Sequence, residues 1–330
     1  MSSFRPTRFV FALCFVAFSA ASSQAAVVTV DCSKKSAKSI NATLATLDKS
    51  ATNTVKLVGA CKELVVIERF RDLTLVGSAG ASISDPTPSD PTPSAPDDEI
   101  DTVLYIGPQS NVTLRSLTIT GGASGISCVQ ISICTLEDVI VEDVKGAGVS
   151  FGRSSGTLLG NTIIRGNLGG GLALGASIVG GGQLVDGGPS PQIIDNLGGH
   201  GVRMTDNSTF RGGPYTIAGN FGDGVNAFAS AVSLGGSPDL RTAVTGNGGR
   251  GIFLQSSTLR GGYLSVTGNT KNGVVVSQLS FFRSGLDAIS GNGEQPDVHC
   301  ASVTAATSGT GGSLAPTLGG GTTDCTEPAP

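Results

Sequence analysis

One short phrase recurs along the chain and constrains the fold more than any other feature. Each copy has an Asn, usually after Gly, followed four or five positions later by Gly and then Val, Ile or Leu. The copies span residues 166–172, 196–202, 219–225, 246–252 and 268–274, with a degenerate copy at 143–149 and the start of another at Gly291-Asn292. Successive copies lie 22 to 29 residues apart. A regular period of this length indicates one structural coil per repeat.

Short apolar runs flank each copy and identify the elements inside a coil. Apolar residues such as Ile217, Val244 and Ile289 stand in runs of alternating character that are too short for helices, which predicts strands. A second turn is marked by the Gly pairs at 187–188, 212–213 and 261–262. Each coil is therefore predicted to run strand, turn, strand, turn, strand.

These repeats predict an all-β parallel solenoid in which every strand pairs with its equivalents in the coils on either side. Weaker strand patterns extend the stack back to Leu64, which gives about nine to ten coils over residues 63–305. Gly and Asn suit turns that need a positive φ. The Asn side chains of successive coils are expected to form a hydrogen-bonded ladder, whose members are Asn167, Asn196, Asn220, Asn247, Asn269 and Asn292.

The two ends of the chain are expected to lie outside the solenoid. Residues 1–25 combine Arg5 and Arg8 with an apolar run and a small-residue end at Ala25, which is typical of a secretory signal peptide. Residues 26–62 are predicted to form an N-terminal cap, with an amphipathic helix over residues 36–47. Residues 306–330 are predicted to form a Gly/Thr-rich tail. The protein is therefore expected to be secreted, periplasmic or at the cell surface.

Six Cys remain once Cys14 leaves with the signal peptide, and an even count in an exported protein favours disulfides over zinc. Six Cys allow fifteen pairings, of which position along the chain favours the three that close local loops. These pairs are Cys32–Cys61, Cys128–Cys134 and Cys300–Cys325.

Composition narrows the function classes. The formal net charge is −4, only 14% of the residues are charged and there are two His, which argues against nucleic-acid binding and against a multi-metal enzyme. No apolar run approaches the roughly 20 residues that span a bilayer. Residues 84–100 are predicted to form a Pro-rich loop. Calcium could bind its acids Asp97, Asp98 and Glu99 and the following Asp101, but a solvated charged loop is the simpler interpretation, so no cofactor is predicted.

The repeat, over roughly residues 55 to 300, resembles the right-handed parallel β-helix superfamily, whose pectin-lyase-like fold carries an Asn ladder at one turn. The resemblance implies a fold rather than an activity. Enzymes of this superfamily mostly act on acidic polysaccharides, by hydrolysis with paired carboxylates or by β-elimination with an Arg or Lys base and often calcium. Others are phage tailspikes and exported proteins without an assigned role.

The motifs of those enzymes are largely missing. Gly-His-Gly at 199–201 is similar to a polygalacturonase motif, but the carboxylate motifs that precede it there are absent. His200 instead occupies the variable position of the repeat, equivalent to Gly170, Asp223 and Arg250, and is interpreted as an ordinary repeat residue. His299, beside Cys300, is interpreted as structural or exposed. The Asp-Pro-His pattern of alginate epimerases and a repeated Asp cluster for calcium are also absent.

An arginine register is the remaining chemical feature. Arg211, Arg260 and Arg283 take the same position in their coils, and we hypothesise that they bind carboxylate or sulfate groups of a polymer, with Arg203 and Arg250 nearby. Local ion pairs or a merely soluble sheet face are the alternatives. Tyr215 and Tyr263, after Gly pairs, could stack on sugars, although inward packing is the favoured interpretation. Residues 181–191 and 235–241 exceed the usual coil length and are the expected walls of any groove.

Three functions are compatible with these observations. The leading interpretation is an exported, non-catalytic β-helix protein that binds a polysaccharide. The alternatives are a polysaccharide lyase or hydrolase of unusual motif, and a structural spacer or adhesin-like protein. Saturable binding without turnover would indicate the first, and new chain ends on a polymer would indicate the second.

Overall fold

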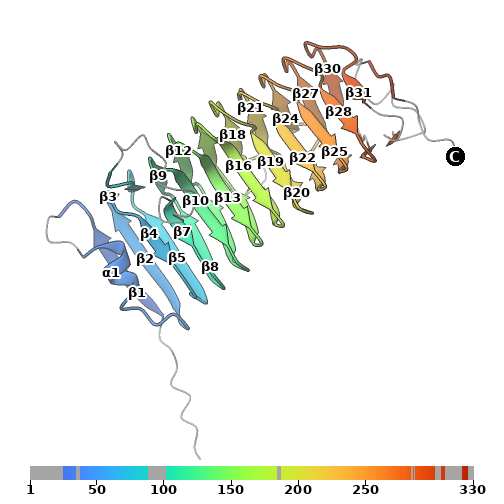
Figure 1. Ribbon diagram of the computed structural model, residues 1–330. Helices are drawn as coiled ribbons and strands as arrows, with labels where there is room; N and C mark the ends of the chain where they lie inside the picture. Colours follow the sequence, from blue (N-terminus) through green and yellow to red (C-terminus); the bar gives the residue numbers. More distant parts are fainter. Residues whose placement is uncertain are drawn as a thin grey trace, which may run out of the picture.

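The computed structural model describes residues 25–34, 38–87, 102–183, 187–283, 285, 287–301, 306–308 and 322–325. These residues form a parallel β-helix in which each full coil adds one strand to each of three sheets, named A, B and C here. Figure 1 shows the strands stacked along one axis from the blue N-terminal end to the red C-terminal end. The all-β solenoid predicted from the repeat is confirmed, including its order of three strands per coil.

The strands follow one another in the order A, B, C along the chain. Sheet A contains β1 (Ala26–Asp31), β2 (Thr52–Val58), β5 (Asp72–Gly77), β8 (Asn111–Arg115), β11 (Ile133–Glu137), β14 (Ser155–Leu159), β17 (Ile178–Gly182), β20 (Thr209–Gly212), β23 (Ala231–Leu234), β26 (Thr258–Gly261), β29 (Phe281–Arg283) and β32 (Ala306–Ser308). Sheet B contains β3 (Ala60–Lys62), β6 (Ser82–Ser84), β9 (Thr118–Thr120), β12 (Ile140–Glu142), β15 (Ile163–Arg165), β18 (Gln192–Ile194), β21 (Thr216–Ala218), β24 (Thr242–Thr245), β27 (Leu264–Thr267) and β30 (Ala288–Ser290). Sheet C contains β4 (Val65–Ile67), β7 (Thr102–Ile106), β10 (Ser124–Val129), β13 (Ala147–Gly152), β16 (Gly170–Gly175), β19 (Val202–Thr205), β22 (Val225–Phe228), β25 (Ile252–Gln255), β28 (Val274–Ser277) and β31 (Val298–Cys300).

The core consists of stacked columns of equivalent side chains from successive coils. The central column of sheet B shows the principle, because each member pairs in parallel register with the next and none is exposed to solvent. Its members are Ile119, Val141, Ile164, Ile193, Ile217, Val244, Val266 and Ile289. Strand alternation thus directs this column inward and leaves its neighbours outside, and the longer strands of sheets A and C direct two alternate columns inward, as Val112 and Leu114 do in β8.

The Asn ladder runs along the turn between sheets B and C. Asn167 Nδ2 donates to Asn196 Oδ1 at 2.9 Å, and the same bond repeats at 2.7 to 3.0 Å down to Asn292. Asn292 then donates to Asp297, which ends the ladder. The Gly before five of these Asn residues has φ between +64° and +67°, a region that glycine enters without steric cost. This preference explains the Gly-Asn pair of the repeat.

A second polar column, which the sequence analysis missed, lies at the turn between sheets C and A. It consists of buried serines at one position in eight coils, namely Ser110, Ser132, Ser154, Ser177, Ser208, Ser230, Ser257 and Ser280. In most of these coils the serine N–H donates to the next serine Oγ, as from Ser257 to Ser280 at 3.0 Å. The column satisfies backbone groups that the turn would otherwise leave buried and unpaired.

The N-terminal helix is shorter than predicted. α1 spans Ile40–Leu44, with Ser39 Oγ accepting from the N–H of Ala42 at 3.0 Å as the N-cap. After the helix, the N–H groups of Thr46 and Leu47 donate to carbonyl oxygens three residues back rather than four, which is the 3₁₀ pattern. The α-helix therefore ends before them. Residues 36 and 37 of the predicted helix lie outside the described residues. That α1 caps the solenoid stays a prediction.

The stack has about eleven coils, slightly more than predicted. Two strands assigned to the cap, β1 and β2, pair in parallel with each other, and β2 pairs in turn with β5 of sheet A. These residues have the same alternation as later coils but lack the Gly-Asn turn, so counting that turn missed them.

Three disulfides link Cys32 to Cys61, Cys128 to Cys134 and Cys300 to Cys325, which is the pairing expected from position along the chain. The predicted signal peptide lies outside the described residues, apart from Ala25, as do the acids Asp97, Asp98, Glu99 and Asp101 and most of the predicted loop and tail. Within the described residues, no helix has the length and apolar character needed to cross a membrane.

Candidate binding groove and arginine row

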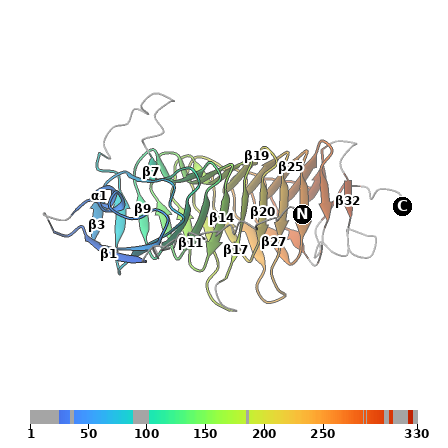
Figure 2. The same ribbon diagram turned by 90° about the horizontal axis from the view of Figure 1, so that it is seen from below.

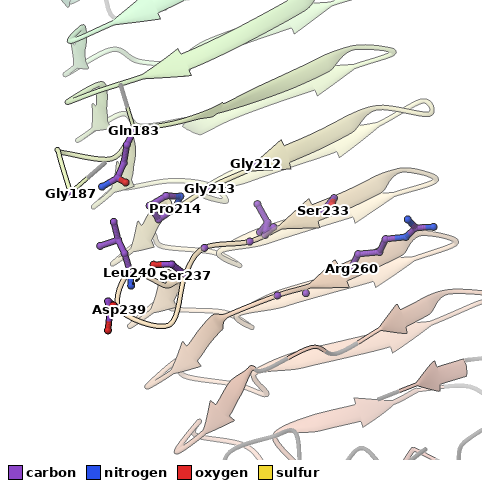
Figure 3. Close-up of a pocket in the computed structure, with 15 residues that line it drawn as sticks. Gln183, Gly187, Gly212, Gly213, Pro214, Ser233, Ser237, Asp239, Leu240 and Arg260 are labelled. Carbon is purple, nitrogen blue, oxygen red and sulfur yellow. Dashed lines mark hydrogen bonds between the residues drawn. The ribbon is translucent and has the colours of Figure 1, made fainter. Parts of the chain in front are cut away.

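A groove of about 930 Å³ lies beside the turns that lead from sheet A to sheet B. Its walls come from the two loops that exceed the usual coil length: Gln183 and Gly187 belong to the first, and Ser237, Asp239 and Leu240 belong to the second. Figure 2 shows both loops projecting from the stack, and Figure 3 shows Gln183 and Leu240 on either side of the coil between them. The two loops expected from the sequence to wall any groove therefore line this groove.

The floor of the groove is almost without side chains. Gly212, Gly213 and Pro214 come from the middle coil, and Gly261 and Gly262 come from a later one. A Cβ atom on Gly213 would lie 2.2 Å from the carbonyl oxygen of Gly235, so the coils are too close there for a larger residue. The backbone surface is therefore open to a ligand that lies along the stack.

Arg260 lines the groove and belongs to a row of outward side chains on sheet A. Parallel register aligns Arg211 with Ser233, Ser233 with Arg260, and Arg260 with Arg283. Adjacent members are therefore separated by one strand spacing, about 4.8 Å. The three arginines are exposed, and in the described part of the chain no carboxylate lies within 4.0 Å of any of them. We call Arg211, Arg260 and Arg283 the arginine row.

Two other exposed arginines on strands have acidic partners. Arg115 contacts Glu137 at 2.6 Å, and Arg165 contacts Glu142 at 2.7 Å. The alternative that the arginine row serves local ion pairs therefore finds no support among the described residues. These paired arginines provide matched controls for mutagenesis.

Arg203 and Arg250 do not belong to the row, contrary to the expectation that they lie near it. Arg203 is an outward residue of β19 in sheet C, and Arg250 precedes β25 of the same sheet. Arg250 donates to both oxygens of Asp223, each at 3.0 Å, and its guanidinium lies 3.7 Å from the centre of the Phe253 ring. It is therefore already engaged within the protein.

Asp223 is a buried carboxylate whose charge is compensated locally. Burial acts to raise its pKa, but hydrogen bonds from Arg250 and from the side chain of Asn226 outweigh burial, so the pKa lies below its usual value. His200, in the preceding coil, accepts a hydrogen bond at Nδ1 from the N–H of Asp223 at 3.0 Å. The pKa of His200 is lowered, chiefly by burial.

The suggested pair of stacking tyrosines is not present. Tyr215 is fully buried, lies 4.9 Å from Phe210 between ring centres, and occupies space that Gly181 leaves beneath sheet A. Burial also raises the pKa of its phenol. Register aligns Tyr215 with Thr242 and Leu264, not with Tyr263. Tyr263 is half-buried, and the Arg241 guanidinium lies 5.8 Å from the centre of its ring.

His299 has a structural contact. Its Nδ1 lies 2.7 Å from Asp324 Oδ2, beside the Cys300–Cys325 disulfide, and so links β31 to residues 322–325. Among the described residues, Cys300, Asp324 and Cys325 are the one group close enough together to suggest a metal site. Because the disulfide uses both sulfur atoms, this group lacks the thiolates that would hold a metal.

Comparison with known proteins gives a likeness of fold alone. No family model and no curated protein matches the chain. Among solved structures, the A-module of the mannuronan C-5 epimerase AlgE6 from Azotobacter vinelandii is similar, with 14% sequence identity, a TM-score of 0.48, and coverage of 88% of this chain and 85% of that one. The three parallel sheets themselves show that the chain is a parallel β-helix, and no particular family is indicated. The fold and the site together define a β-helix protein with a lateral groove and an arginine row that has no carboxylate partner among the described residues.

Proposed function

We propose that the protein is an exported, non-catalytic β-helix protein that binds an acidic polysaccharide along the groove and the arginine row. The observation that carries this proposal is the combination of Arg211, Arg260 and Arg283 in one register without carboxylate partners in the described part of the chain. Guanidinium groups bind carboxylate and sulfate with two parallel hydrogen bonds, so such a row favours a polymer with repeated anionic groups.

Geometry supports a chain-like ligand rather than a single small molecule. The row and the groove both run along the solenoid axis, with one side-chain position per coil. The spacing between coils is comparable with the length of one sugar unit in an extended polymer, so successive anionic groups can meet successive positions of the row. The walls offer polar groups at Gln183, Ser237 and Asp239 for the uncharged part of a sugar.

The chemistry of the groove supports binding rather than turnover. Among the described residues of its lining, Asp239 is the one carboxylate and Arg260 the one strong base. Hydrolysis of a glycosidic bond ordinarily uses two carboxylates that flank the bond. Export is supported by three disulfides, which persist in oxidising compartments.

The test measures binding and turnover together. The protein is incubated with pectate, alginate, chondroitin sulfate and a neutral glucan, with and without calcium, and both co-sedimentation and new chain ends are scored. We expect saturable co-sedimentation with an acidic polymer, none with the glucan, and no new ends. New ends would instead establish an enzyme with an arginine of the row as the candidate base.

Two double variants make the result specific. R260A/R283A removes two unpaired charges, and R115A/R165A removes two charges that are paired with Glu137 and Glu142, so both change the net charge equally. Each exposed charge pair with the polymer contributes roughly 0.7 kcal/mol, so R260A/R283A should weaken binding about tenfold. Equal weakening by both variants would show that only net charge matters and would contradict the proposed site.

A further inference from the structure

The turn of the coil that contains Asn196 differs from its neighbours by one residue. Asn196 and Gly201 are five positions apart, whereas Asn167 and Gly171, and Asn220 and Gly224, are four apart. The Asn ladder continues through Asn196, and Val202 pairs in register with the coils on both sides. The extra residue therefore lies between these two points, within Gly198-Gly199-His200. We call these three residues the bulge.

The bulge rests directly on the backbone of the preceding coil. A Cβ atom on Gly198 would lie 1.7 Å from the carbonyl oxygen of Leu168, and one on Gly199 would lie 2.5 Å from that of Gly169. Both positions therefore require glycine for close approach.

The extra residue also breaks the backbone hydrogen bonds that join neighbouring turns. The N–H of Gly169 donates to Gly146 at 2.9 Å, and the N–H of Gly222 donates to Gly199 at 2.8 Å. By contrast, the N–H groups of the bulge donate to no residue in the described part of the chain. These three successive N–H groups, without acceptors among the described residues, are therefore available to a ligand.

Two side chains add donors at the same place. His200 and Arg203 line a cavity of about 290 Å³ together with Gly198, Gly199 and Gly170. Because His200 Nδ1 accepts from the N–H of Asp223, the ring proton of the neutral imidazole lies on Nε2. Within the described residues, neither this N–H nor the Arg203 guanidinium has an acceptor or a carboxylate partner.

The charge around the cavity is positive. Asp223 is the carboxylate that lies nearby, and Arg250 and Asn226 already occupy both of its oxygens. Arg203 is then left as an uncompensated charge beside backbone and imidazole donors. Such a set of donors around a positive charge suits an oxyanion and disfavours a cation.

We propose that this cavity, at the turns that lead from sheet B into β16 and β19 of sheet C, is a second ligand site, which binds an oxyanionic group such as a carboxylate, sulfate or phosphate. Arg203 supplies the charge, His200 Nε2–H directs one hydrogen bond, and the bulge supplies backbone donors. The site is separate from the groove, which lies at the turn between sheets A and B, so it does not depend on the function proposed above.

Nuclear magnetic resonance can test the site directly, because the chain has two His, and His299 serves as an internal control. The protein is titrated with sodium sulfate, sodium phosphate and sodium glucuronate at constant ionic strength set by sodium chloride. We expect saturable shifts of the His200 Nε2 signal and of the Gly198 and Gly199 amides, with the His299 signal unchanged. The anion with the lowest dissociation constant identifies the class of group that the site prefers.

Variants separate a built site from general charge effects. R203A should weaken binding at least tenfold, and R203K should recover only part of it because Lys lacks the planar fork of Arg. R153A removes an exposed arginine at another turn and should have no effect, and R260A/R283A should also have none. Shifts that grow linearly at both His, or equal weakening by R203A and R153A, would overturn the proposal.

Discussion

The Asn ladder gives the sharpest prediction about stability. Asn220 is 1% exposed, and its side chain makes four hydrogen bonds. Oδ1 accepts from the N–H and Nδ2 of Asn196 at 3.3 and 2.7 Å, and Nδ2 donates to Ile193 O and Asn247 Oδ1 at 3.0 and 2.9 Å. N220A removes all four and leaves their partners buried. At about 1 kcal/mol per bond, the free energy of unfolding should fall by about 4 kcal/mol.

The assay is urea unfolding followed by far-ultraviolet circular dichroism, with N161A as the control. Asn161 is exposed, and its side chain makes no hydrogen bond within the described residues, so N161A should change stability by less than about 0.5 kcal/mol. Because solenoids can unfold in parts, amide exchange at Asn196 should report the same local loss.

A double variant tests whether the ladder acts as a connected unit. The bond from Asn220 Nδ2 to Asn247 Oδ1 is lost in either single variant. N220A/N247A should therefore cost about 1 kcal/mol less than the sum of the two single variants. Strict additivity, or an N220A midpoint equal to that of N161A, would refute the reasoning.

Three further predictions concern the turns, the bulge and the disulfides. Gly246 has φ +64° and open space around its Cβ position, so G246A should lower the free energy of unfolding by about 1 kcal/mol through left-handed backbone strain. Gly262 has equal space and an ordinary φ, so G262A should not have this cost. Equal urea midpoints for the two variants would contradict this prediction. The pKa of His200 is lowered in the folded protein. The free energy of unfolding should therefore fall as the pH decreases through about 6.5, because the unfolded chain then binds a proton that the folded chain does not. Urea midpoints measured from about pH 8 to 5 should show this dependence in the natural protein and not in H200Q. The Cys32–Cys61 disulfide joins residues 29 positions apart, and Cys128–Cys134 joins residues 6 apart. Chain entropy therefore predicts that the free energy of unfolding falls by about 3.5 kcal/mol in C32A/C61A and by about 2 kcal/mol in C128A/C134A. The reverse order of stability in urea would contradict this prediction.

The sequence was most informative where one coil repeats the next. Alternation located the inward column of sheet B, and the Gly-Asn pair located the turn where φ is positive, because both depend on local geometry that recurs in every coil. The serine column has a period just as regular and could have been found by aligning the coils on the residue that precedes sheet A.

The candidate site was harder to predict because a coil has three faces. Arg203 and Arg211 are eight positions apart and both point outward, but they lie on sheets C and A. Periodicity of two distinguishes inside from outside and does not distinguish one sheet from another. Tyr215 illustrates a different limit, because its burial depends on the space left by Gly181 in the preceding coil, which no local pattern reports.

Departures from the repeat are where a solenoid can acquire function, because the stacked core fixes everything else. The second loop of the groove allows a direct test. Within it, Ser237 and Leu240 bond to each other through their backbones, with N–H to O distances of 2.9 and 3.2 Å, and a Cβ atom on Gly236 would lie only 3.1 Å from the Cα of Arg241. Residues 237–240 thus form a closed excursion whose ends already meet.

Deletion of residues 237–240 should therefore keep the fold and remove one wall of the groove. We expect an unchanged circular dichroism spectrum, a change in unfolding free energy below about 1 kcal/mol, and weaker co-sedimentation with the acidic polymer. R203A is the matched control, because it alters an outward residue on another sheet and should leave this binding intact. If the shortened protein folds and binds the polymer as tightly as the full chain, this loop does not contribute to the binding site. Binding would then depend on the arginine row on the exposed face of sheet A, without the groove.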